Sequence, residues 1–177
     1  APSASGTNLY WINDATQQAA RWSLDASGAY QSGTFLSVDE LYSEETNLSA
    51  DLNGDAIIGM AFSTIESQGN TTLLRRNDGM AYVEASNTRY AVGSPFNLGT
   101  GDEGREWQMI AAETLEDQNQ ILWRNNAENF LHLWSLDAGW NWRSSYGNID
   151  PLSPAALGLE TSFGVDLNGD RQLGGMA

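Results

Sequence analysis

Short runs of alternating apolar and polar residues recur along the chain. In "ARWSLD" (20–25) and "LHLWSLD" (131–137), apolar side chains stand at alternate positions, which predicts strands with one buried face. Each is preceded by a short apolar run that ends in Asn–Asp or Asn–Asn, residues that favour turns. A third short strand follows, as in "AYQSG" (29–33) and "WNWRSS" (140–145). The pattern therefore predicts groups of three antiparallel strands.

Helical signals follow these strand groups. A capping box from Ser37 to Glu40 opens the helix predicted in "SVDELYSEETNLS". Ser153 as N-cap and Pro154 at the first helical position open another in "SPAALGLETSFG". Both sequences therefore predict a helix with a defined start.

A third helix is predicted over Arg105–Asp117. Trp107, Ile110, Ala111 and Thr114 are spaced by three and four residues, so they would share one side of that helix. Together these elements predict a β-β-β-α unit of about 50 residues.

The unit repeats. "RWSLDASGAY" (21–30) aligns with "LWSLDAGWNW" (133–142) without gaps, and "DLNGD" occurs at both 51–55 and 166–170. A weaker middle copy carries "EDQNQ" (116–120), which we interpret as a reduced form of "DLNGD". We therefore predict an α+β fold of tandem β-β-β-α repeats, with short antiparallel strands packed against helices. The predicted bounds are an N-terminal tail at 1–7, a partial repeat at 8–59, and a complete repeat domain at 60–177 with half-units 70–118 and 119–174.

The run from Ser63 to Gly174 contains "TLLRRNDGMAYVEA", "LWSLDAGWNWRSS" and "ALGLETSFGVDLNGD". It resembles the tryptophan-rich repeat domain at the C-terminus of large cyanobacterial proteins. Residues 8–59 resemble the second half of a preceding copy. The resemblance implies an extracellular or cell-surface module with no established enzymatic activity. The family's acidic turn usually has Gly after its second Asp, whereas Ala56 and Arg171 stand there in this chain.

The charge and the absence of Cys limit the classes of partner and chemistry that the chain can support. The chain has 23 acidic and 8 basic residues, all of the latter Arg, and a net charge of −15. This acidity argues against nucleic acid and anionic membranes and is compatible with cations. Absence of Cys excludes disulfides and thiolate chemistry. No apolar run approaches the roughly 18 residues of a membrane helix, so we expect no membrane insertion.

The acidic loops are candidate calcium sites, because alternate Asp and Asn side chains on a tight loop supply oxygen ligands. The ligands would be Asp51, Asn53, Asp55 and the Ile57 carbonyl in one loop, and Asp166, Asn168, Asp170 and the Gln172 carbonyl in the other. Neither loop has the Gly and Glu that an EF-hand places at its sixth and twelfth positions. Glu45 and Glu160, in matching places upstream, are candidates for the missing carboxylate. The alternative is a turn whose Asp side chains accept backbone hydrogen bonds.

Seven Trp residues give a second set of candidates. The four that recur at equivalent places are predicted to fill the core: Trp11, Trp22, Trp123 and Trp134. Trp140 and Trp142 alternate beside Asn141 and Arg143, so they are either partly buried or available to stack on sugar rings.

The leading functional hypothesis is a non-catalytic, extracellular structural or adhesion-type repeat module, calcium-stabilised and self-associating. Its expected partners are other copies of the chain or neighbouring repeat domains, with surface glycans as a further candidate. The alternative is a carbohydrate-binding module that uses Trp140 and Trp142. We expect no enzyme, because the single His132 lies on a strand in a chain without Cys and has no evident Ser partner.

Overall fold

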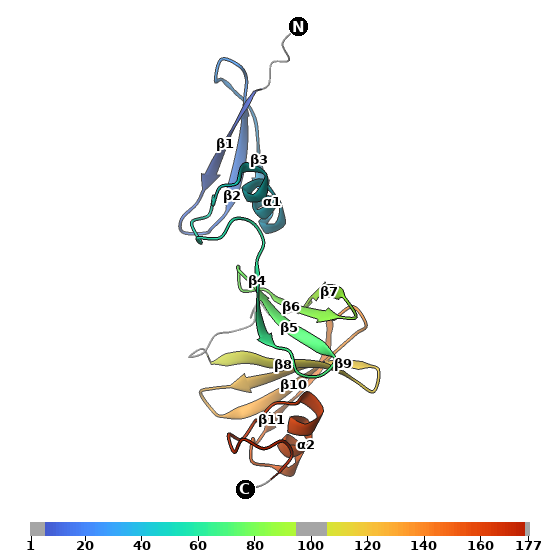
Figure 1. Ribbon diagram of the computed structural model, residues 1–177. Coiled ribbons are helices and arrows are strands. Elements are labelled where there is room, and N and C mark those ends of the chain that lie inside the picture. Colours follow the sequence, from blue (N-terminus) through green and yellow to red (C-terminus); the bar gives the residue numbers. More distant parts are fainter. Residues whose placement is uncertain (1–5, 95–105, 176–177) are drawn as a thin grey trace. The chain divides into compact units, whose positions relative to one another are not determined.

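The computed structural model describes residues 6–94 and 106–175 (Figure 1). The chain divides into two compact units, Ala1–Ala61 (unit 1) and Phe62–Ala177 (unit 2). Of the predicted tail, residues 1–5 lie outside the described part, and Thr7 already belongs to a strand.

Unit 1 is one antiparallel sheet with a helix. Its strands are β1 (Thr7–Ile12), β2 (Ala19–Leu24) and β3 (Tyr30–Leu36), in the order β1-β2-β3, and α1 (Val38–Leu48) follows. The predicted capping box of α1 is confirmed: the Ser37 side chain accepts from the Glu40 amide, and the Glu40 side chain accepts from the Ser37 amide.

The helix lies against one face of this sheet. The Tyr10 hydroxyl of β1 donates to Glu44 Oε2 of α1 at 2.9 Å, and Arg21 of β2 forms an ion pair with Glu44. Among the described residues of unit 1, the buried hydrophobic side chains are Ala19, Leu41 and Tyr42. Unit 1 therefore buries a very small apolar core.

Unit 2 contains two four-stranded antiparallel sheets that pack face to face. The first has β4 (Phe62–Glu66), β5 (Thr71–Arg76), β6 (Ala81–Ala85) and β7 (Thr88–Ala91) in sequential order. The second has β8 (Trp107–Leu115), β9 (Gln118–Asn125), β10 (Phe130–Leu136) and β11 (Trp142–Ile149) in the order β11-β10-β9-β8. The helix α2 (Pro154–Phe163) follows, with Ser153 as its N-cap as predicted.

Two apolar clusters hold unit 2 together. Between the sheets lie Leu73, Ala81, Val83, Val92, Met109, Ala112, Ile121, Trp123, Trp134, Leu136 and Trp140. On the other face of the second sheet, α2 and the loop after it contribute Ala156, Phe163 and Leu167 to a cluster with Ala111, Leu122, Leu131 and Ile149. Figure 1 shows β4–β7 in green and β8–β11 in yellow to orange. The second sheet is thus covered on both faces.

The predicted α+β fold of tandem β-β-β-α repeats is wrong. The described residues form three antiparallel sheets and two short helices, an arrangement that is mostly β and sandwich-like in unit 2. In the helix predicted over Arg105–Asp117, Arg105 lies outside the described residues and Trp107–Leu115 form strand β8. Met109 and Ala112 face the cluster between the sheets, while Ala111 faces the cluster under α2. A strand buried on both faces is apolar at successive positions, so its pattern also fits a helical spacing.

The sequence "EDQNQ" is part of a hairpin. Leu115 pairs with Gln118, and the two residues between them, Glu116 and Asp117, have φ of 50° and 61°. Two central residues with positive φ define the tight turn that best joins twisted antiparallel strands. The interpretation of this stretch as a reduced acidic loop is therefore wrong.

Unit 1 has the same strand register as the second half of unit 2. Leu9 pairs with Trp22, and Trp22 with Gly33, as Ile121 pairs with Trp134, and Trp134 with Ser145. An irregularity also occurs at the same place, before Leu24 in β2 and before Leu136 in β10. Strands β1, β2 and β3 are therefore equivalent to β9, β10 and β11.

Candidate functional site: the acidic loops and an exposed aromatic face

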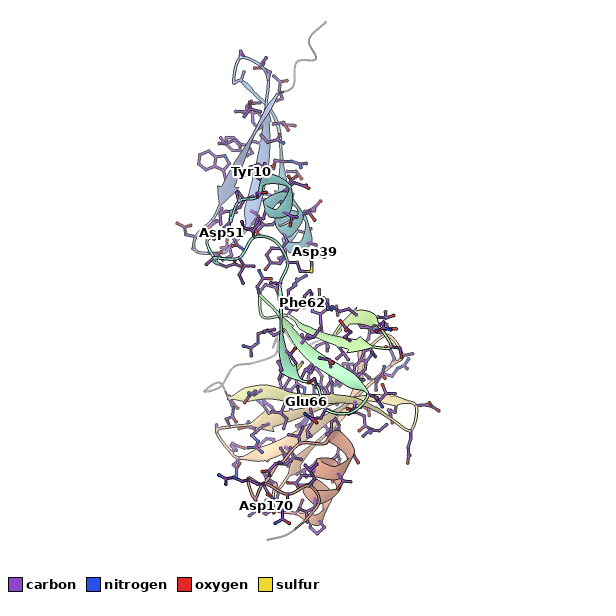
Figure 2. All side chains as sticks on the ribbon, in the orientation of Figure 1. Tyr10, Asp39, Asp51, Phe62, Glu66 and Asp170 are labelled. Atoms are coloured by element: carbon purple, nitrogen blue, oxygen red, sulfur yellow. The ribbon has the colours of Figure 1, made fainter. Side chains whose placement is uncertain are left out.

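The loop after α1 is held by side chains that accept from its own backbone. Asp51 Oδ1 accepts from the Gly54 amide at 2.7 Å, and Asp51 Oδ2 accepts from the Ala56 amide at 2.9 Å. Asn53 and Asp55 each accept from the amide two residues later, at 3.0 and 2.8 Å. Figure 2 labels Asp51 in this loop.

The loop after α2 repeats this arrangement. Asp166 accepts from the Gly169 amide at 2.7 Å and from the Arg171 amide at 2.8 Å. Asn168 accepts from the Asp170 amide, and Asp170 from the Gln172 amide, both at 2.8 Å. The bond from the Arg171 amide is the main cause that holds the pKa of Asp166 below its usual value. The loop is therefore built around ionised Asp166.

A buried glutamate anchors each loop to the preceding helix. Glu45 Oε1 accepts from the Leu52 and Asn53 amides at 3.0 and 3.2 Å, and Oε2 accepts from the Gly59 amide at 2.9 Å. Its side chain is fully buried. The carboxylate thus satisfies three backbone donors that bracket the acidic loop.

Glu160 has the same role in unit 2. It is fully buried and accepts from the amides of Leu167, Asn168 and Gly174 at 2.9, 3.1 and 3.0 Å. Both glutamates were predicted from the sequence as further cation ligands. Their hydrogen bonds to backbone amides were not predicted. Their equal spacing from the two loops was the available signal.

A glycine closes each loop where nothing larger fits. A Cβ built on Gly59 would lie 2.3 Å from Thr46 Oγ1, and one on Gly174 would lie 2.3 Å from Thr161 Oγ1. Both glycines have positive φ, 78° and 71°. The glutamate, the acidic loop and this glycine form one motif, which we call the anchored loop.

The anchored loops were predicted to bind calcium through Asp51, Asn53, Asp55 and Ile57, and through Asp166, Asn168, Asp170 and Gln172. Each of the Asp and Asn side chains accepts at least one backbone hydrogen bond, and the Ile57 and Gln172 amides are donors in them. Among the described residues, no group of three or more Asp, Glu or His side chains could hold a metal ion. This geometry favours the structural turn, and calcium binding stays a prediction.

Ala56 and Arg171 occupy equivalent loop positions that have a positive φ. Their φ values are 67° and 66°, a left-handed conformation that costs a residue with a Cβ about 1–2 kcal/mol. Ala56→Gly and Arg171→Gly are therefore each expected to raise the free energy of unfolding by about 1 kcal/mol. Chemical denaturation of the full chain measures this gain. Ala50→Gly, just before the same loop, is the control, and an equal gain there would contradict the explanation.

Trp140 is placed where no sugar reaches it. Its side chain is only 1% exposed and lies between the two sheets of unit 2. Trp140 has a φ of 61°, and its amide donates to the carbonyl three residues earlier. Gly28 and Gly79 hold the same position, with the same hydrogen bond, in the turns Asp25–Ala29 and Arg76–Met80. Trp142 is half-buried and packs against the same cluster. The pair therefore does not form the flat exposed platform that sugar stacking requires.

The four recurring tryptophans differ between the units. Trp123 and Trp134 are 1% and 4% exposed, so their predicted core position is confirmed. Trp11 and Trp22 are 51% and 39% exposed, so the core prediction is wrong for them. The reason is the sheet β4–β7, which covers Trp123 and Trp134 and has no counterpart among the described residues of unit 1.

The uncovered side of unit 1 is an aromatic face, which we define as Leu9, Trp11, Trp22, Tyr30 and Phe35. All five are exposed, and none is charged. The Trp11 and Trp22 ring centroids lie 5.4 Å apart at 55°, and those of Trp22 and Tyr30 lie 5.4 Å apart at 76°.

The rings of the aromatic face are thus tilted against one another rather than coplanar. A Cβ at Gly33 would lie 2.9 Å from Trp22 Cδ1, so the Trp22 ring lies closely over this glycine. The sequence contained the signal for this face: an uncharged alternating set in three consecutive strands.

Two buried carboxylates in unit 2 respond to pH. Burial raises the pKa of Glu66 above its usual value of 4.5, and the charge of Glu113 adds to the rise. Burial likewise raises the pKa of Glu113. Glu66 Oε2 is buried and has no hydrogen-bond partner among the described residues.

Because folding raises the pKa of Glu66, its contribution to stability is complete below pH 4.5 and is lost as the pH rises through the folded pKa. Glu66→Gln is therefore expected to stabilise unit 2 at neutral pH and to have little effect on the acid side of that value. Thermal unfolding at a series of pH values measures this. Glu128→Gln, at an exposed position, is the matched control. A gain that did not change with pH would contradict the electrostatic explanation.

The single histidine, His132, lies beside an aromatic ring. Its ring lies 5.6 Å from that of Trp107 in an edge-to-face contact, and burial lowers its pKa. A Cβ at Gly147 would lie within 1.9 Å of His132 Nδ1, so the backbone of β11 packs directly on the imidazole.

The described residues define a mostly β protein of three antiparallel sheets, sandwich-like in unit 2, in which β1–β3 and β9–β11 share one register. Residues 72–174 match the family described as the tryptophan-rich Synechocystis species C-terminal domain, and the chain belongs to this family. The comparison with curated proteins and with solved structures gave no match. In the part of the chain that the structure describes, no helix is long and apolar enough to cross a membrane.

Proposed function

We propose that the protein is a non-catalytic structural repeat module of adhesion type, acting outside the cell or at its surface. In this proposal, unit 1 joins the chain to other repeat modules through the aromatic face. One observation carries it: the aromatic face is exposed in unit 1, while its equivalent in unit 2 is covered by a second sheet.

The energetics of unit 1 support association. A domain of about 60 residues buries so little surface that its stability is marginal. Full burial of one large apolar side chain contributes about 1.5–3 kcal/mol, and the aromatic face offers five partly exposed ones. The monomer leaves much of this apolar surface exposed, and a partner that covers the face adds the stabilisation from burying it.

Charge sets the conditions of the test. With a net charge of −15, copies of the chain repel one another at low ionic strength. At about 1 M salt the Debye length falls to about 3 Å, and the apolar attraction is no longer opposed at long range. We therefore expect the sedimentation coefficient of the full chain to rise with concentration at high salt.

The variant Trp11→Glu places a charge in the aromatic face and is expected to abolish this rise. Tyr146→Glu is the matched control, because Tyr146 is also an exposed aromatic side chain, on β11 of unit 2. Concentration-independent sedimentation of the unmodified chain, or equal loss in both variants, would refute association through the aromatic face.

Calcium is tested separately. One loop supplies three side-chain oxygens and one carbonyl, fewer than the six to eight oxygens that calcium takes. Calcium binding predicts that about 1 mM calcium, compared with chelator, raises the melting temperature, whereas a purely structural turn predicts no change. A rise that disappears in both Asp51→Asn and Asp166→Asn would show that the anchored loops bind calcium. Asp14→Asn, in an exposed turn, is the control.

A further inference from the structure

In unit 2, a second sheet covers the equivalent of the aromatic face. Strands β9, β10 and β11, the counterparts of β1, β2 and β3, are covered by the sheet β4–β7, while β8 pairs with the outer edge of β9. We propose that the aromatic face of unit 1 binds a half-repeat of the β4–β8 type, which covers the face with a sheet and adds one strand to β1. This inference rests on the proposed function, because it names the partner for the same face.

The covering sheet is defined by its chemistry. In unit 2 it presents Leu73, Ala81 and Val83, all buried, to the tryptophans of the opposite sheet. These aliphatic side chains and the tryptophans belong to one apolar cluster. Because Leu9 and Trp11 occupy the places of Ile121 and Trp123, the partner needs a similar uncharged aliphatic face.

The edge of the unit 1 sheet matches as well. Strand β1 is at the edge of its sheet, whereas its counterpart β9 pairs with β8 along its length. In that pairing Thr114 lies opposite Asn119 and Ala112 opposite Ile121. The equivalent positions on β1 are Thr7 and Leu9, so a β8-type strand has a defined register there.

One difference makes the partner specific. Where Trp140 fills the space between the sheets of unit 2, unit 1 has Gly28. A half-repeat that fits unit 1 closely must therefore bring a larger side chain to this place. The segment β4–β8 of the present chain has the uncharged aliphatic face but lacks a larger side chain opposite Gly28.

The absence of native cysteines allows a direct test. A second copy of residues 62–118 is joined by a flexible linker ahead of residue 6 of the full chain. Thr7→Cys in unit 1 is combined with Thr114→Cys in the added segment. The proposal predicts a disulfide under mild oxidation, together with loss of the self-association seen at high salt.

The control replaces Thr7→Cys by Asn8→Cys. Asn8 is one residue out of register, so its side chain faces the opposite side of the sheet from Thr7 and Leu9, and no disulfide is expected. Equal cross-linking of both variants indicates non-specific contact and overturns the proposal.

A second variant adds Gly28→Trp, which gives unit 1 the filling side chain of unit 2. Cross-linking in this variant alone supports the half-repeat partner and assigns specificity to residue 28. No cross-linking in either background overturns the proposal, whether or not the unmodified chain self-associates. Self-association without cross-linking would instead point to a second copy as the occupant. If cross-linking occurs but the unmodified chain does not self-associate, only the self-association in the proposed function is refuted.

Discussion

Replacing Glu160 by Ala is expected to remove about 3–5 kcal/mol from the free energy of unfolding of unit 2. The fully buried carboxylate accepts from the amides of Leu167, Asn168 and Gly174. Without it these donors lose their acceptor, and each buried donor left unpaired costs about 1–3 kcal/mol. Urea unfolding of the full chain, followed by tryptophan fluorescence, measures the change.

The conservative variant Glu160→Gln separates hydrogen bonding from packing. Its carbonyl oxygen can still accept two of the three bonds, while its amide group faces a donor, so an intermediate loss is expected. Glu116→Ala, at an exposed hairpin turn of unit 2, is the control for removal of an acidic side chain. A loss below about 1 kcal/mol in Glu160→Ala would show that water satisfies these amides and that the anchor has little weight.

Trp123→Ala is expected to cost about 3–5 kcal/mol, whereas Trp11→Ala should change the stability of the monomer by less than about 1 kcal/mol. The two residues occupy the same position of the repeat, and they differ in cover: Trp123 is 1% exposed and Trp11 is 51% exposed. Removing the first ring leaves a cavity between two sheets, while removing the second leaves none.

Denaturant unfolding at low protein concentration and low salt gives both values for the monomer. Repeating the measurement under associating conditions should raise the cost of Trp11→Ala, because the covered ring then contributes to the interface. A large cost of Trp11→Ala in the dilute monomer would contradict the exposure of this ring. It would also remove the observation on which the proposed function depends.

Helix starts could be predicted because their signals are local. Ser37 with Glu40, and Ser153 with Pro154, act within one helical turn, and both helices begin where the sequence placed them. Strand β8 could not be predicted in this way. Its side chains are buried by α2 on one face and by β4–β7 on the other. The sequence of the strand alone does not indicate either neighbour.

The candidate site shows the same division. The positions of the acidic loops and of the recurring tryptophans follow from the sequence alone. Whether Trp11 is covered depends on a sheet that its own segment does not encode. The role of Glu45 depends on a bond to Gly59 that closes only when the loop has folded. Residue types therefore predicted which positions form the candidate site. The exposure and hydrogen bonds of those residues depend on packing between distant segments of the chain.

The anchored loops also bear on the order in which the chain folds. Glu45 and Glu160 each reach a glycine 14 residues further on, so the entropy lost in closing these loops is small. Contacts between the two sheets of unit 2 span far more chain, as in the bond from Thr71 to Ala112 across 41 residues. Local closures form faster than distant ones. We therefore expect each helix and its anchored loop to form early, and in unit 2 the packing of the sheet β4–β7 on the tryptophans to be the slow step of folding.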